Sequence, residues 1–156
     1  MVPKVTQLDQ PTVAELAEAA MVFDQYRRHY GQPVVAGQTR AWLTQYTRSG
    51  MLSIFTAHIG WDLVGIATTV VVPASLRLAC SWQIRDLYVV PSARRCGAGR
   101  ALVTAVATAA SRVGAIRLSI QTEPANTAAL QLYRTSGFVP VDDLHTLSLD
   151  LAPSNT

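Results

Sequence analysis

A glycine-rich segment at residues 94–100 separates a strand-like apolar run from a helix-like one. The run before it is Ile84 to Val90, and the residues after it are rich in Ala, Val and Leu. Gly97 and Gly99 can adopt positive φ and let the backbone approach an anion closely. The helix that follows presents unpaired N–H groups and the positive end of its dipole. A strand, a glycine turn and a helix in this order predict a site for a pyrophosphate-bearing ligand.

Two common phosphate-binding loops do not match this segment. A Walker loop ends in Gly-Lys-Ser or Gly-Lys-Thr, whereas Gly99 is followed by Arg100 and Ala101. A dinucleotide-binding fingerprint needs a third glycine three positions later, and this chain has Leu102 there. The spacing excludes both motifs.

The pattern Arg-x-x-Gly-x-Gly, formed by Arg94, Gly97 and Gly99 after the segment Asp-Leu-Tyr-Val-Val-Pro at 86–91, resembles the acyl-CoA loop of the GNAT superfamily of N-acetyltransferases. Further along the chain, residues 126–138 are similar to the superfamily's Asn-x-x-Ala-x-x-x-Tyr-x-x-x-Gly-Phe segment. The two motifs in this order and spacing identify the chain as a member of that superfamily, and the resemblance covers nearly its whole length.

Apolar periodicity predicts the secondary structure. After an initial strand, helical patterns cover residues 10–30, 39–48, 100–113 and 126–137, and strand-like runs cover 51–58, 63–72, 78–90, 115–121 and 146–151. The resulting order, β-α-α-β-β-β-α-β-α-β, is that of an α/β sandwich with a mixed, mostly antiparallel central sheet flanked by helices, as the resemblance also implies. We expect a single domain over residues 1–156, with 152–156 as a flexible tail.

Composition and the N-terminal segment favour a compact globular protein of the cytosol. Apolar residues make up 49% of the 156 residues and charged residues only 15%, as in a compact globule. The longest apolar stretch, residues 63–80, is interrupted by Pro73 and Arg77, so it is too short for a membrane span. The segment Met1 to Lys4 leads directly into polar residues and lacks the apolar core of a secretory signal. We therefore predict a cytoplasmic protein with no membrane partner.

Positive charge gathers at the glycine loop. The net charge is +3, and three arginines lie in or beside the loop: Arg94, Arg95 and Arg100. Such a cluster suits a polyphosphate ligand. Nucleic-acid binding would need a longer basic stripe interleaved with aromatic residues. The segment 26–30 is the only other candidate and is a weak one, so nucleic acid is expected only as a carrier of an acyl group.

The two cysteines are too few and too far apart in sequence for a metal cluster. A cytosolic chain is not expected to keep a disulfide, so Cys80 and Cys96 are interpreted as structural. Cys96 lies in the loop and could be exposed and reactive. A role for its backbone alone is favoured over catalysis, and no metal is expected.

The resemblance implies acetyl-CoA as co-substrate. In the superfamily, the strand before the loop splays from its neighbour, and its free backbone groups pair with the pantetheine arm, here at Leu87 to Val89. The N–H of Leu87 then polarises the acyl carbonyl, a contribution of about 3 kcal/mol. The residues expected to contact CoA are Leu87, Tyr88, Val89, Arg94, Arg95, Cys96, Gly97, Ala98, Gly99, Arg100, Asn126 and Tyr133.

Tyr133 is the expected general acid. It lies seven residues after Asn126, two helical turns, so both can face one ligand. By resemblance, Tyr133 protonates the departing CoA thiolate, and a phenol near pKa 10 needs no perturbation to do so. Packing in the core is the alternative role. Asn126 could contact the cofactor, cap the helix, or do both.

The general base is not settled by the sequence. An amine must be neutral to attack, and Asp86, Glu123 and His29 are the candidates to remove its proton. Asp86 precedes the catalytic backbone segment, although it could instead brace a turn or pair with a nearby arginine. Proton release through water to bulk solvent is a further alternative.

The acceptor is expected to meet Tyr26, His29, Tyr30 and His145. The first three precede a Gly-Gln-Pro break where the superfamily's first helices wall the acceptor site, and His145 begins the predicted last strand. Asp24 is the only acidic residue in the segment 23–33, which disfavours polyamine and aminoglycoside acceptors. Small amines, peptide N-termini, lysine side chains and antibiotics stay open.

The preferred interpretation is an N-acyltransferase that transfers an acetyl group to a primary amine by direct attack in a ternary complex. A non-catalytic acyl-CoA-binding module is one alternative, which the presence of Tyr133 disfavours. Another is the same fold using an acyl group delivered by a carrier protein or a tRNA. A homodimer is a possible assembly under each of these three interpretations.

Overall fold

The computed structural model describes residues 1–151, and the tail expected at 152–156 lies outside the described residues. Two short 3-10 turns, Ser75–Arg77 and Pro91–Ala93, connect regular elements. The elements are β1 (Lys4–Gln7), α1 (Val13–His29), α2 (Gln38–Arg48), β2 (Ser53–Ile59), β3 (Asp62–Ala74), β4 (Ala79–Val89), α3 (Ala98–Arg112), β5 (Leu118–Ile120) and α4 (Thr127–Thr135).

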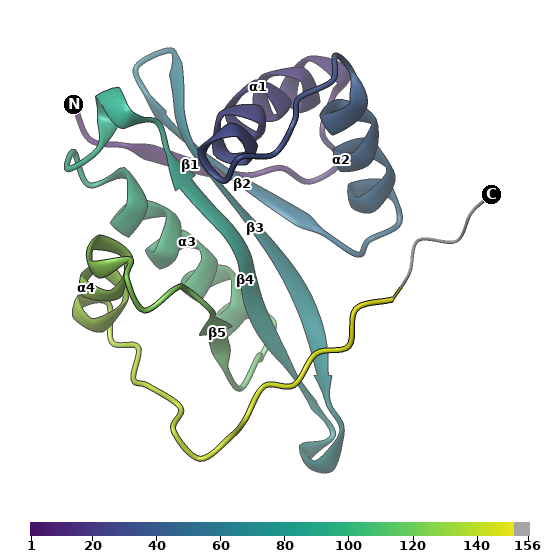
Figure 1. Cartoon of the computed structure of the whole chain (residues 1–156), viewed down its shortest axis with the longest axis vertical. Helices are drawn as coiled ribbons and strands as arrows, with labels where there is room; N and C mark the ends of the chain where they lie inside the picture. The colour runs from purple at the N-terminus through teal and green to yellow at the C-terminus, as the bar shows by residue number, and fades with distance from the viewer. Residues whose placement is uncertain (152–156) are drawn as a thin grey trace.

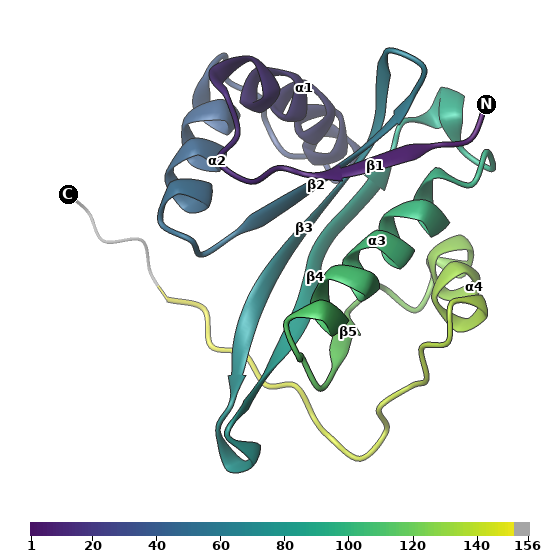
Figure 2. The same cartoon turned by 180° about the vertical axis from the view of Figure 1, so that it is seen from behind.

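The strands form one mixed sheet in the order β1-β2-β3-β4-β5. The first four strands pair antiparallel, and β5 joins β4 in parallel. Figures 1 and 2 show α1 and α2 on one face of this sheet and α3 on the other, with α4 beside α3. The expected α/β class, with a mostly antiparallel sheet between helices, is confirmed.

Strand alternation divides the core into two layers. Successive residues of a strand point to opposite faces of the sheet. Ile54 and Ile66 therefore pack toward α1 and α2, in a cluster that includes Phe23, while their neighbours Phe55 and Ala67 pack toward α3. Each layer contains fully buried aliphatic side chains, which hold the helices against the sheet.

Local signals explain most helix and turn boundaries. A capping box joins Thr12 and Glu15 at the start of α1, so the helix begins three residues later than the pattern suggested. Gly114 follows α3 at φ +77°, as expected of a residue that ends a helix in the left-handed region. Among residues 1–151, none of the helices combines the length and apolar character that crossing a bilayer requires.

The prediction of a last strand over 146–151 is wrong for the isolated chain. These residues carry no secondary structure and are exposed. In Figures 1 and 2 the segment leaves α4 and crosses the β3–β4 hairpin without joining the sheet. The alternating leucines make the segment strand-like, but a strand also needs an edge to pair with, and periodicity does not show whether the chain reaches one.

Candidate active site

An opening in the sheet lies between β4 and β5. The two strands pair only from Trp82 and Leu118 to Ile84 and Ile120, whereas β4 continues to Val89. A β-bulge sits just beyond the last pair, because the register with β3 skips one residue between Asp86 and Ile84. Bulges bend a strand and increase its twist. The second half of β4 thus has a neighbour on one side only.

The free edge of β4 carries the backbone of Leu87. The N–H of Val90 donates to Val64 O in β3 at 2.9 Å, and hydrogen-bonded pairs alternate along an antiparallel ladder. Tyr88 and Asp86, which share the parity of Val90, therefore also bond to β3. Leu87 and Val89 direct their N–H and C=O groups the other way, into the opening.

The glycine loop between β4 and α3 has an irregular backbone. Arg95 lies at φ +64° and Gly97 at φ +85°, and Gly97 is the N-cap of α3 with no side-chain cap. The first intrahelical bond there runs from Ala101 N to Gly97 O at 2.9 Å. The N–H groups of Ala98, Gly99 and Arg100 are thus the orphan donors of the first turn, as an anion site needs.

The loop arginines have different environments. Arg94 Nε donates to Val89 O at 3.1 Å, and its guanidinium lies 5.7 Å from the ring centroid of Tyr88. Arg100 instead donates to Thr135 in α4, to the hydroxyl at 2.8 Å and to the carbonyl at 3.3 Å. All three arginines and Cys96 are exposed. Arg100 therefore joins α3 to α4 as well as facing the loop.

Tyr133 is buried in α4 at 7% exposure, with its ring 5.8 Å from that of Phe138. Burial first, and the nearby Tyr30 and Glu123 next, raise the pKa of Tyr133 to about 12. This pKa differs from the ordinary value near 10 that the sequence analysis assumed for Tyr133. The side chain stays protonated at neutral pH, but it is a weaker acid toward a thiolate than an ordinary tyrosine. Asn126 caps α4, its Oδ1 accepting from Ala129 N at 3.2 Å.

A polar cluster spans the opening. Tyr30 follows the end of α1, and its hydroxyl lies 3.5 Å from Oε2 of Glu123 in the loop after β5. Burial and then Glu123 raise the pKa of Tyr30. The same two residues influence Tyr133. Elements distant in sequence therefore bring two predicted site residues and one candidate base to the same place.

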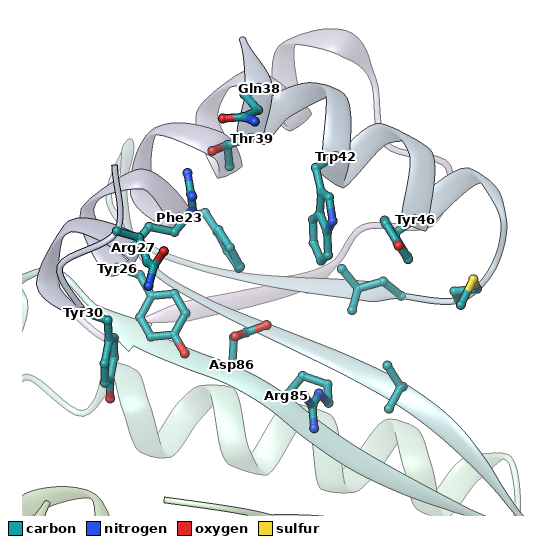
Figure 3. A pocket seen from close by; sticks show the side chains of 14 residues that line it. Phe23, Tyr26, Arg27, Tyr30, Gln38, Thr39, Trp42, Tyr46, Arg85 and Asp86 are labelled. Carbon is teal, nitrogen blue, oxygen red and sulfur yellow. The ribbon is translucent and has the colours of Figure 1, made fainter. Parts of the chain in front are cut away.

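Asp86 lies on the face of β4 that α1 covers. It accepts a short hydrogen bond from Thr68 Oγ1, and the hydroxyl of Tyr26 points toward it (Figure 3). Burial first, then the charge of Asp86 and a hydrogen bond to it, raise the pKa of Tyr26. The carboxylate is thus positioned by two hydroxyl donors rather than by an arginine pair.

A cavity of about 600 Å³ adjoins Asp86 between α1, α2 and the sheet (Figure 3). Its wall includes the expected acceptor residues Tyr26 and Tyr30. Sequence reasoning missed several lining residues, namely Phe23, Arg27, Trp42, Tyr46 and Arg85. The spacing of Trp42 and Tyr46, four residues apart on a predicted helix, was the available signal. The size is that of a small-molecule site.

The two histidines expected at the acceptor site are placed differently. His29 is exposed, with its ring 5.1 Å from Tyr30 and 6.3 Å from Tyr88, and it is not among the residues that line the cavity. His145 lies in the exposed C-terminal segment outside any strand. Within residues 1–151, no group of three or more His, Cys, Asp or Glu side chains is arranged to hold a metal ion.

Known sequences match most of the chain. A family model described as the acetyltransferase (GNAT) family matches residues 17–138. An uncharacterized N-acetyltransferase of Bacillus subtilis, YhfO, is 30% identical over 129 residues, which cover 83% of this chain and 87% of that protein. The residues matched by the family model include both the glycine loop and the segment around Tyr133.

Solved structures share the fold. A probable acetyltransferase superposes with a TM-score of 0.87 at 24% identity, over 96% of this chain and 98% of that one. An aminoglycoside acetyltransferase from an uncultured soil metagenomic sample, solved with trehalose, has a TM-score of 0.81 at 18% identity, over 96% and 97% of the two chains. A ribosomal-protein-alanine N-acetyltransferase from Brucella melitensis biovar Abortus has a TM-score of 0.78 at 14% identity, over 97% and 100%.

Proposed function

Because the chain belongs to the GNAT family of acetyltransferases, we propose that it transfers an acetyl group from acetyl-CoA to a primary amine by direct attack in a ternary complex. The observation that carries this proposal is the free edge of β4 beside an α3 N-terminus that has no side-chain cap. A backbone edge can pair with an amide-containing arm, and orphan N–H donors can bind its pyrophosphate end.

The described residues fit the co-substrate in three respects. Leu87 and the N–H of Val89 offer unpaired backbone groups in the opening, whereas the Val89 carbonyl accepts from Arg94 Nε at 3.1 Å. The loop combines left-handed Arg95 and Gly97 with exposed arginines. No side chain occupies the space next to Gly97, since a Cβ built there would meet nothing within 4 Å. The group would supply an activated thioester whose acyl carbon the amine attacks.

The chain's own groups would act on charge and protons. The N–H of Leu87 would donate a hydrogen bond to the acyl oxygen as negative charge develops there. As the new C–N bond forms and the C–S bond breaks, Tyr133 would donate its hydroxyl proton to the sulfur. Tyr133 must then be reprotonated before the next turnover, and its pKa of about 12 favours uptake of that proton at neutral pH.

Asp86 is the favoured proton acceptor for the attacking amine. It faces the cavity and immediately precedes Leu87. The Cα atoms of the two residues are therefore about 3.8 Å apart. Glu123 lies across the opening near Tyr30 and Tyr133, so it suits proton exchange with Tyr133 better than contact with the acceptor. His29 is outside the cavity lining and is disfavoured.

The test is an assay of CoA release from acetyl-CoA across an amine panel, combined with direct measurement of CoA binding. Turnover with at least one primary amine, together with CoA binding, supports the proposal. Tight CoA binding without turnover on any amine would indicate a non-catalytic acyl-CoA-binding module. Neither binding nor turnover would indicate another acyl donor, such as a carrier protein or a tRNA.

A further inference from the structure

The cavity beside Asp86 has an aromatic wall. Phe23 stacks against Trp42 with ring centroids 6.2 Å apart and planes inclined by 26°. Trp42 in turn lies 4.5 Å from Tyr46. Figure 3 shows these rings on one side of the cavity, with Asp86 and Tyr26 on the other. Such a wall binds flat apolar groups and attracts cations over its ring faces.

The charges around the cavity limit what can enter. Asp86 is the one carboxylate among its lining residues in the described chain, and Arg27 and Arg85 also line it. Asp24 accepts a hydrogen bond from Thr39 Oγ1 and does not line the cavity. A ligand with one ammonium group can place it at Asp86, whereas further positive charges would meet the arginines at an unfavourable cost.

We infer that the acceptor is a monoamine with a flat apolar body, held with its amino group at Asp86 and its body against Trp42. This inference rests on the proposed function and names the substrate class of its site. Asp86 and Leu87 are consecutive residues, so an amino group bound at Asp86 lies close to the free edge of β4. A cavity of about 600 Å³ is large enough for a body of one or two rings.

The test measures binding as well as turnover. The probes are 2-phenylethylamine, its uncharged analogue 2-phenylethanol, and spermidine as a polycation. Affinity is measured by calorimetry with CoA present and absent. We expect 2-phenylethylamine to bind at least about tenfold more tightly than either other probe, since only it satisfies both the rings and the carboxylate. Equal or tighter binding of spermidine would overturn the inference.

Two tryptophans provide a matched pair of variants. Trp42→Ala should weaken 2-phenylethylamine binding about tenfold or more, because it removes the central ring of the wall. Trp61→Ala alters a fully exposed tryptophan in the β2–β3 turn. It should leave the affinity for 2-phenylethylamine unchanged. Unchanged affinity in Trp42→Ala would overturn the inference. Failure of the proposed function has a different signature: no acetyl transfer to any amine and no CoA binding, even where the aromatic amine binds.

A second, independent observation concerns the C-terminal segment. Leu147, Leu149 and Leu151 are 90%, 83% and 82% exposed, in the alternating pattern of a strand with one apolar face. Within residues 1–151, β5 is paired on one side only, so its other edge is open. The β3–β4 hairpin that the segment crosses also exposes Val71 and Val72.

We propose that residues 146–151 pair with the open edge of β5 in a second copy of the chain. An unpaired strand and an unpaired edge in one chain complement each other across a twofold axis, because each copy offers what the other lacks. Pairing within one chain is the competing arrangement. It is disfavoured because the segment leaves α4 and crosses the hairpin instead of following β5.

Light scattering on the purified chain tests this second proposal. We expect a dimer at micromolar concentration. Leu147→Glu combined with Leu149→Glu should give a monomer that still binds CoA. Met21→Glu, which places one negative charge at an exposed apolar residue of α1, should remain dimeric. A monomeric native chain would overturn the proposal, and slow amide exchange over residues 146–151 in that monomer would show pairing with its own β5.

Discussion

The hydroxyl of Tyr30 lies 3.5 Å from Oε2 of Glu123, across the opening between β4 and β5. The two residues are 93 positions apart in sequence, and both influence the pKa of Tyr133. The contact joins the end of α1, which walls the cavity, to the loop that precedes α4. Tyr30 therefore connects the cavity that we propose for the acceptor with Tyr133, the residue proposed to protonate the leaving group.

Tyr30→Ala should raise the acceptor KM and leave CoA binding unchanged. The side chain is 46% exposed, so its removal should cost less stability than truncation of a buried aromatic ring, which costs about 3 to 5 kcal/mol. Melting temperature and both Michaelis constants decide the question, with Tyr30→Phe as the control that keeps the ring. A large melting loss with an unchanged acceptor KM would assign Tyr30 to packing alone.

Tyr133→Phe should lower kcat about 100-fold while CoA affinity changes by no more than a few-fold, because the ring is kept and only the proton donor is lost. Single-turnover rates should be compared with CoA binding by calorimetry. If acyl transfer is rate-limiting and full kcat survives, Tyr133 is a packing residue.

Alkaline pH should destabilise the fold through the buried phenols. The ordinary value for tyrosine is 10.0, and the folded chain raises the pKa of Tyr133 to about 12. Above pH 10 the unfolded chain releases protons that the folded chain keeps, so the free energy of unfolding falls as pH rises. The stability is complete below pH 10 and is lost up to about pH 12. Denaturant unfolding at several pH values should show a shallower decline in Tyr133→Phe.

Substitution of Gly97 should abolish the stabilisation by CoA. A hundredfold excess of CoA over its Kd should stabilise the native chain by about 2.7 kcal/mol. A side chain at φ +85° is strained although it has free space, and straightening this turn would displace the orphan donors of α3. Thermal shifts with CoA should therefore disappear in Gly97→Val.

Two further glycines sharpen this comparison. A Cβ at Gly99 would lie 3.1 Å from Cδ2 of Leu132 in α4, so Gly99→Val should also lose the CoA shift, through a clash rather than backbone strain. Gly114 has a similar φ of +77° and open space, but it lies at the far end of α3. Gly114→Val should cost comparable stability and keep the full CoA shift. Equal shifts in all variants would remove the loop from the CoA site.

Asp86→Asn should lower kcat at least about tenfold, because an amide cannot take the proton of the attacking amine. Glu123→Gln is the matched carboxylate variant, and it should have the smaller effect on kcat/KM for the acceptor. Steady-state kinetics with both substrates varied separate the two. A larger loss in Glu123→Gln would transfer the role of base to Glu123.

Local patterns in the sequence are enough to predict the family, the fold class and the glycine loop. Arg94, Gly97 and Gly99 lie within a segment of six residues. Their conformational properties are local, so their spacing alone identified the turn. Helix periodicity and the cap at Asn126 are local for the same reason. These features need no knowledge of distant contacts.

Contacts between residues distant in sequence become visible in the folded chain alone. The cavity combines Trp42 of α2 with Asp86 of β4, and neither carries a local mark of the other. The raised pKa of Tyr133 depends on burial and on Tyr30 and Glu123, which sequence spacing does not reveal. The last strand was predicted and did not form, because a strand needs a partner edge as well as a pattern. Burial, electrostatics and strand pairing are properties of neighbours in space.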